Sequence, residues 1–96
     1  MKQGGIYAIV NMIDGKVLVG STENFRQRRN AHLSEVRNGK HGNPFFQRAW
    51  NKYGEQSFEF RILEECDSDM LFIREDAWMD YYNSLNEQCG YNLQGA

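Results

Sequence analysis

The chain has 96 residues, which is enough for one modest hydrophobic core and too few for two, so we expect residues 1–96 to form a single domain. Hydrophobic residues make up 41% of the chain and charged residues 25%, an ordinary globular composition that argues against intrinsic disorder. No apolar run approaches the roughly 20 residues that cross a bilayer, and the first residues have no signal-peptide pattern. We therefore expect a cytoplasmic protein without a membrane partner.

The net charge of −2 hides an uneven distribution of charge along the chain. Residues 26–53 carry seven basic side chains and one acidic side chain, a net charge of +6, whereas residues 54–96 carry a net charge of −8. A basic block of this size can form a positive face that contacts phosphates. Charges along one helix are more often only a solvated surface, so the block alone indicates little.

Cys66 and Cys89 are the two cysteines of the chain. Neither has the paired spacing or the neighbouring histidine of a zinc site. We expect two free, partly buried thiols rather than a disulfide, since nothing in the sequence indicates an oxidising compartment.

The first half of the chain predicts a β-hairpin followed by a helix. Residues 5–12 and 17–20 are rich in β-branched and aromatic side chains, and Asp14-Gly15 between them is a strong hairpin signal. Residues 21–24 offer several helix N-caps, and apolar side chains then recur at helical spacing until Gly39.

The second half predicts two more helices with a strand between them. Asn43-Pro44 is typical of a helix start, and Gly54 would end that helix. Alternation over residues 58–63 predicts a strand. Asp67-Ser68 would begin a long third helix, with an apolar stripe formed by Leu71, Trp78, Tyr82 and Leu85. The order predicts an α/β (α+β) fold in which helices cover at least one face of a small, mainly antiparallel sheet.

Glu75 lies inside the apolar stripe of the predicted third helix, four residues after Leu71 and three before Trp78. A carboxylate facing a core is normally paired, protonated or bound to a metal. Spacing alone puts a structural ion pair slightly ahead of a metal site, and Arg28 is a plausible partner in either case.

Arg28 and His32 lie one helical turn apart on the predicted first helix and project side by side. A guanidinium and an imidazole in this arrangement suit a phosphate, although an exposed basic ridge is the simpler interpretation. His41, in the loop after this helix, is expected to be exposed to solvent.

Tyr7 and Asn92 are ambiguous when each is taken alone. Tyr7 lies on the first strand among apolar neighbours, where a buried ring with a satisfied hydroxyl is the common outcome. Asn92 follows Gly90-Tyr91 and could be a turn residue that bonds its own backbone.

The ordered set of these residues resembles the GIY-YIG nuclease family from Gly5 to Asn92. Gly5-Ile6-Tyr7 matches the first signature, and Leu18-Val19-Gly20, which begins eleven residues after Tyr7, stands where the second signature belongs. The residues at the family's arginine, histidine, glutamate and asparagine positions are Arg28, His32, Glu75 and Asn92. The likeness is greatest to the catalytic domain of phage intron homing endonucleases, where His41 also has a counterpart.

The resemblance implies a small three-stranded antiparallel sheet flanked by three helices, and metal-dependent cleavage of double-stranded DNA. Glu75 would hold Mg²⁺, with Mn²⁺ as a possible substitute, and Arg28 would neutralise the phosphate. Tyr7 would take the proton of the attacking water, and His32 would hydrogen-bond that tyrosine or shuttle its proton. Specificity would come from loops, a homodimer or a separate partner. The supporting residues would be His41, Asn92 and Gly20, and the DNA-binding residues Arg26, Arg29, Lys40, Arg48 and Lys52.

Leu18 is the one departure from the signatures, because it stands where the family has a second tyrosine. Leucine cannot hydrogen-bond or transfer a proton. The alternative function is therefore a catalytically impaired nucleic-acid-binding or regulatory domain. The retained Tyr7, Arg28 and Glu75 favour activity.

Overall fold

A three-stranded antiparallel sheet forms the centre of the protein. The computed structural model describes residues 3–95. The strand order is β2-β1-β3, with β1 at Gly5–Asn11, β2 at Val17–Thr22 and β3 at Phe58–Glu65. Both pairings of β1 are antiparallel, which confirms the predicted sheet. Strands β2 and β3 each run two residues further than the sequence pattern indicated.

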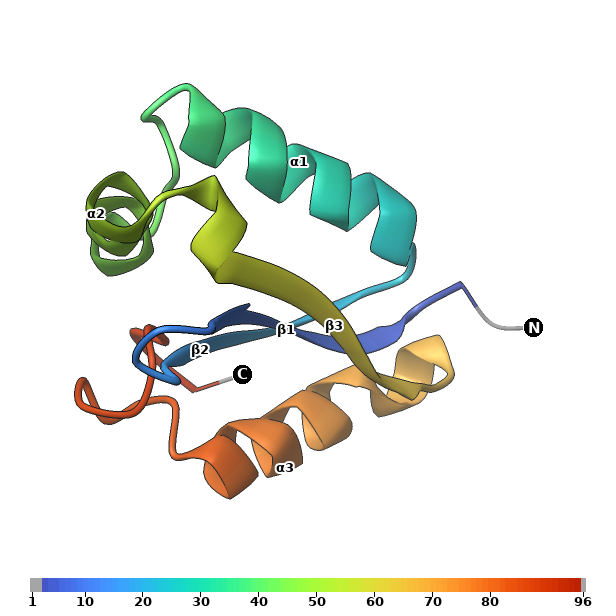
Figure 1. The fold of residues 1–96 in the computed structure, drawn as a ribbon. Helices are drawn as coiled ribbons and strands as arrows, with labels where there is room; N and C mark the ends of the chain where they lie inside the picture. The colour runs from blue at the N-terminus through green and yellow to red at the C-terminus, as the bar shows by residue number, and fades with distance from the viewer. Residues whose placement is uncertain (1–2, 96) are drawn as a thin grey trace.

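Helices cover both faces of this sheet, as Figure 1 shows. Helices α1 (Phe25–Arg37) and α2 (Pro44–Tyr53) lie on one side, and α3 (Leu71–Tyr82) lies on the other. Two short 3₁₀ turns, at Glu55–Ser57 and Ser68–Met70, precede β3 and α3. The chain is thus a three-layer arrangement.

The first two helices begin where the sequence predicted, because asparagine side chains cap them. Asn24 accepts a hydrogen bond from the Gln27 amide, and Asn43 accepts from the amides of Phe45 and Phe46. Gly54, with φ of 88°, follows the last residue of α2, as expected.

The third helix is shorter than predicted at both ends. Residues 68–70 form the 3₁₀ turn, so α3 begins at Leu71 rather than at Asp67-Ser68. Asn83 adopts a left-handed conformation with φ of 54° and ends the helix. Leu85 therefore lies outside α3 and is 50% exposed, and its expected place in the apolar stripe was wrong.

The alternation of β1 divides the core into two parts. Tyr7 and Ile9 pack towards α1 and α2, whereas Ile6, Ala8 and Val10 pack towards α3. Because β1 is covered on both faces, every one of its residues is buried.

The two cysteines form no disulfide with each other. Cys66 and Cys89 are both free and half-buried, as expected. Within residues 3–95, no helix combines the length and the apolar character needed to cross a bilayer.

Candidate active site

The candidate site lies at the edge strand β2, where side chains from both faces of the sheet reach one pocket of about 410 Å³. Gly20 stands directly opposite Tyr7 in the β1–β2 register, on the α1 side. Ser21, the next residue, contacts α3. Within residues 3–95 no further strand pairs with β2, so groups from both sides of the sheet share the pocket. Its lining consists of Tyr7, Leu18, Val19, Gly20, Ser21, Arg28, His32, Glu35, His41, Gly42, Asn43 and Glu75.

Tyr7 is the most tightly held member of the site. Its side chain is 3% exposed, and its ring stacks on Phe60 with centroids 4.9 Å apart. Its hydroxyl oxygen accepts a hydrogen bond from Arg28 Nε at 3.3 Å and lies 2.7 Å from His32 Nε2. The expectation of a buried ring with a satisfied hydroxyl is confirmed, and two of its partners are the residues predicted beside it.

The backbone sets the direction of a hydrogen-bond chain that ends on Tyr7. The Asn43 amide donates to His41 Nδ1 at 3.0 Å, so a neutral His41 carries its proton on Nε2. His41 Nε2 lies 2.7 Å from His32 Nδ1 and therefore donates to it. His32 is then protonated on Nε2 and donates to the Tyr7 oxygen. The assigned tautomers leave the proton of Tyr7 directed away from His32.

Burial keeps the groups of this chain uncharged. Burial, followed by the nearby Arg28 charge and by His41, lowers the pKa of His32 to about 3. Burial also lowers the pKa of His41. The pKa of Tyr7 is raised, chiefly by burial, although the hydrogen bond and the charge of Arg28 act in the opposite direction. At neutral pH both imidazoles and the phenol are therefore neutral.

Glu75 approaches the pocket from α3 and is half-buried. The Ser21 hydroxyl donates a short hydrogen bond to its Oε1. Within residues 3–95, Glu75 forms no ion pair with Arg28 or with any other cation. The ion pair with Arg28 that spacing slightly favoured is therefore not formed, although both side chains line the pocket: Arg28 Nε donates to Tyr7, and Glu75 accepts from Ser21. Ser21, expected only as a possible helix cap, is a contact that sequence reasoning missed.

His41 and Asn92 differ from their simplest interpretations. His41 is half-buried rather than exposed, since its ring stacks on His32 and meets the edge of Phe46. Asn92 does not bond its own backbone. Its side-chain amide exchanges two hydrogen bonds of 2.9 Å with the backbone of Val19, and it lies outside the pocket. Asn92 thus supports the outer edge of β2.

The expected DNA-binding residues are all exposed, and none lines the site pocket. Arg48 and Lys52 lie over the rings of Phe45 and Tyr53 and line a separate groove between α2 and the C-terminal segment. Arg29 borders a different cavity. The remaining two, Arg26 and Lys40, lie at the start of α1 and in the loop that follows it.

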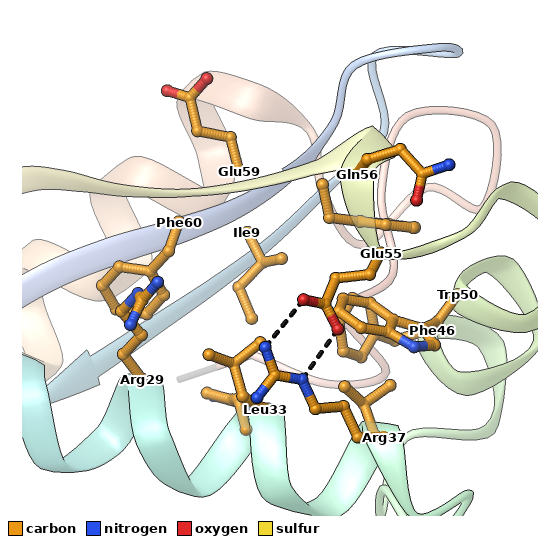
Figure 2. Close-up of a pocket in the computed structure, with 13 residues that line it drawn as sticks. Ile9, Arg29, Leu33, Arg37, Phe46, Trp50, Glu55, Gln56, Glu59 and Phe60 are labelled. Atoms are coloured by element: carbon orange, nitrogen blue, oxygen red, sulfur yellow. Dashed lines mark hydrogen bonds and ion pairs between the residues drawn. The ribbon is translucent and has the colours of Figure 1, made fainter.

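The cavity beside Arg29 lies between α1, α2 and β3 and has a volume of about 220 Å³ (Figure 2). Its lining is mainly apolar, with Ile9, Leu33 and Phe46 among the labelled side chains. The Arg37–Glu55 ion pair, 2.7 Å long, spans it. It shares only His32 with the candidate site and offers no set of reactive groups.

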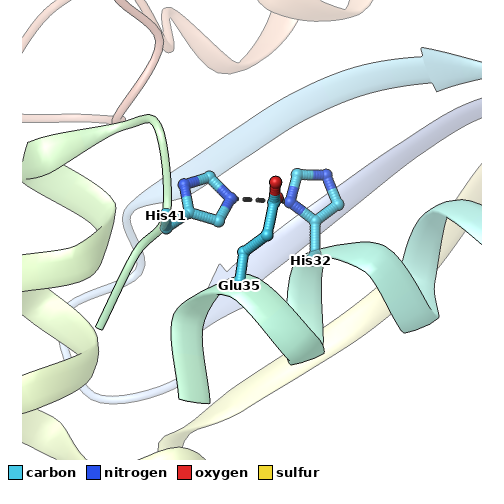
Figure 3. A group of neighbouring side chains, drawn as sticks. All are labelled: His32, Glu35 and His41. Atoms are coloured by element: carbon cyan, nitrogen blue, oxygen red, sulfur yellow. Dashed lines mark hydrogen bonds between the residues drawn. The ribbon is translucent and has the colours of Figure 1, made fainter. Parts of the chain in front are cut away.

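Three side chains on the α1 side that could bind a metal ion lie close together, which was not predicted from the sequence. His32, Glu35 and His41 converge there, and one ligand atom from each lies within 4.8 Å of the other two (Figure 3). Glu35 follows His32 by one helical turn, a spacing visible in the sequence. Sequence reasoning missed it because the position of His41 depends on the loop between the helices.

The sheet, its helices and the edge-strand site place this protein in a known class. The profile of the GIY-YIG catalytic domain matches residues 3–92, and the chain belongs to this family. The resemblance in the sequence is thereby confirmed.

Two relatives indicate the branch of the family. The chain is 38% identical to Intron-associated endonuclease 1 of Enterobacteria phage T4, over 98% of its own length and 38% of that protein. It is 32% identical to Probable intron-encoded endonuclease 1 of Neurospora crassa, over 96% of its length and 30% of that protein. The chain thus spans well under half of each relative.

Solved structures agree with the fold. A mutant of the catalytic domain of intron endonuclease I-TevI superposes with a TM-score of 0.88 at 38% identity, covering 100% of this chain and 97% of that one. Another structure, of the catalytic domain of homing endonuclease I-TevI, gives a TM-score of 0.86 at 36% identity. It covers 95% of this chain and 98% of that one.

Proposed function

We propose that this chain is the catalytic module of a metal-dependent DNA endonuclease that hydrolyses phosphodiester bonds. The observation that carries the proposal is the position of the Tyr7 oxygen, held by Arg28 Nε and His32 Nε2 in the same open pocket as Glu75. Relatives named as endonucleases over nearly the whole chain support it.

Arg28 is suited to bind the phosphate. Its Nε is engaged by Tyr7, and the residue is exposed at the pocket, which leaves the remaining guanidinium N–H groups available to phosphate oxygens. Charge that develops on these oxygens as water attacks is stabilised by a donor already in place. Arg28 would therefore both orient the phosphate and lower the barrier.

Tyr7 is the candidate base for the attacking water. Its oxygen must first lose its own proton to solvent water in the open pocket, and burial opposes that loss. The N–H groups of Arg28 and His32 point at this oxygen and stabilise the phenolate. Because its assigned tautomer has Nε2 protonated, His32 acts here as a hydrogen-bond donor rather than as the acceptor of the tyrosine proton.

Glu75 fits a magnesium ligand. Ser21 orients one carboxylate oxygen, and within residues 3–95 no other hydrogen bond or ion pair engages the group. A single carboxylate in an open pocket suits Mg²⁺, which retains most of its waters, and Mn²⁺ would be a substitute. A cation bound there would supply Lewis-acid stabilisation of the phosphate charge.

The exposed basic residues of α1 and α2 are proposed to contact the DNA backbone, with Arg48 and Lys52 in their own groove. Such contacts orient the duplex without reading its sequence. A homodimer or a separate specificity partner stays a prediction.

Cleavage of supercoiled plasmid in Mg²⁺ or in EDTA tests the proposal. The wild type should nick or linearise plasmid only with Mg²⁺, and Glu75→Ala and Arg28→Ala should lose about 10²–10³-fold in rate, the loss typical of one transition-state contact. Asp76→Asn, which changes the exposed neighbour of Glu75, is the matched control and should cleave normally. If the wild type binds DNA but leaves it intact, the catalytic proposal fails.

Leu18 provides a test of the alternative, a DNA-binding domain with impaired turnover. Its side chain is 7% exposed, packs in the α1-side core and borders the pocket beside Tyr7. We expect Leu18→Tyr to raise the cleavage rate by adding a hydroxyl near the phosphate. No gain, or a loss, in a variant that still folds would mean that the pocket has been remodelled around leucine.

A further inference from the structure

The side chains of His32, Glu35 and His41 converge on one point of the α1 side of the pocket (Figure 3). We propose that they form a zinc site separate from Glu75, and that Zn²⁺ bound there clamps the loop between α1 and α2 onto α1. The binding does not depend on the proposed nuclease function.

The geometry requires little movement. His32 and Glu35 lie one turn apart on α1, so their side chains project together, and His41 faces them from the loop. The three ligand atoms lie within 4.8 Å of one another, whereas tetrahedral ligands about 2.0–2.2 Å from one zinc ion lie roughly 3.3–3.6 Å apart, so the group must close slightly around the ion. Glu35 is exposed, and its carboxylate has no hydrogen bond or ion pair within residues 3–95, so it is able to close on the ion.

The donor set favours a transition-metal ion such as zinc over magnesium. Two imidazole nitrogens and one carboxylate are typical of zinc, with water completing a tetrahedron, whereas Mg²⁺ prefers oxygen ligands. His32 is 4% exposed, and the lowered pKa values of both histidines keep their rings neutral, as metal ligation requires. Glu35 supplies the one negative charge of the set.

The bound ion would take the place of the hydrogen bond between the two rings. In that bond, His41 Nε2 donates its proton to His32 Nδ1 over 2.7 Å. When the ion takes its place, the His41 proton moves to Nδ1, and the Asn43 amide loses its acceptor. Gly42, next to Asn43, is exposed, and glycine tolerates a wide range of backbone angles, so this amide can turn towards water. His32 Nε2 keeps its proton and its bond to Tyr7.

Calorimetric titration of Zn²⁺ without DNA tests the site. The protein should carry Cys66→Ser and Cys89→Ser, because free thiols also bind zinc. We expect one equivalent to bind, and Glu35→Gln and His41→Gln each to weaken binding by at least about tenfold, the loss that even a residue hydrogen-bonded to a ligand can cause. Glu75→Gln, which alters the other carboxylate of the pocket, should bind zinc as tightly as its parent.

Nitrogen-15 shifts of the two imidazoles give a second readout. Zinc should move the proton of His41 from Nε2 to Nδ1 and leave His32 protonated on Nε2. The proposal is overturned if no zinc binds, if Glu35→Gln binds with unchanged affinity, or if Glu75→Gln abolishes binding. Because Glu35 is exposed, the Glu35→Gln variant should fold even if the His41→Gln variant does not. Failure of plasmid cleavage would leave these results untouched, so the two proposals fail separately.

Discussion

Gly20 leaves no room for a side chain beside Tyr7. A Cβ built there would clash with the hydroxyl and ring of Tyr7, which stands directly opposite on β1. Glycine is needed here for close approach rather than for its backbone angles.

We predict that Gly20→Ala displaces the Tyr7 hydroxyl and lowers the single-turnover cleavage rate by about 10²-fold, the typical effect of an error of about 1 Å in a reacting group. Gly42→Ala is the matched control, because a Cβ at Gly42 meets no atom within 4 Å. Circular dichroism should show both variants folded. Equal rates for the two variants would contradict the position of Tyr7 over Gly20.

His32 makes the stability of the protein depend on pH. Its pKa is about 3 in the folded protein against 6.5 when exposed, so between these values the unfolded chain binds a proton that the folded chain does not. The free energy of unfolding should therefore fall as pH drops below 6.5, and the lowered pKa of His41 acts in the same direction.

Urea unfolding between about pH 7 and about 5.5 measures this effect above the range where most carboxylates titrate. His32→Gln should reduce the slope by up to about 1.36 kcal/mol per pH unit, the value for one proton. An unchanged slope would mean that His32 titrates normally.

At the scale of elements, the position of the site depends on how β2 is held. On one side β2 pairs with β1, and on the other its backbone meets the C-terminal segment through the Asn92–Val19 bonds and a bridge between Val17 and Gly90. Asn92 thus replaces a neighbouring strand at the residue beside Gly20.

We predict that Asn92→Asp keeps the bond accepted from the Val19 amide and loses the bond donated to the Val19 carbonyl. The carboxylate would then face that carbonyl, at a cost of about 1–3 kcal/mol in the free energy of unfolding. Hydrogen exchange at residues 18–20 should accelerate, whereas the β1–β3 pairing should remain protected. Asn86→Asp, at an exposed turn, is the control. Uniform acceleration in the whole sheet would indicate global destabilisation instead.

At the scale of the whole molecule, the sheet separates the charges. The basic block of residues 26–53 contains nearly all of α1 and all of α2, and the net-acidic segment of residues 54–96 contains β3 and α3. The helices of the two segments lie on opposite faces of the sheet (Figure 1). The modest net charge of −2 therefore conceals a positive face.

We predict that Arg48→Ala and Lys52→Ala each weaken DNA binding and reduce the slope of log affinity against log salt by about 0.9, the value for one phosphate contact. Fluorescence anisotropy between about 50 and 200 mM salt measures both quantities. Asp80→Asn, on α3, removes a charge from the opposite face and should leave the slope unchanged. A slope that responds equally to all three substitutions would mean that DNA does not select the α1–α2 face.

Much of the fold could be predicted because its signals are local. The Asp14-Gly15 hairpin and the caps Asn24 and Asn43 depend on residues close in sequence, and the structure has them where they were expected. The third helix was misjudged because its stop, the left-handed Asn83, is not glycine and has no strong sequence signal.

The sequence by itself determined the elements, their order and the inward face of Glu75, because periodicity and capping act within a few residues. Only the tertiary structure decided the partners: Ser21 rather than Arg28 for Glu75, and Val19 rather than its own backbone for Asn92. These contacts join residues more than 50 positions apart and depend on β2 being an edge strand that both faces can reach.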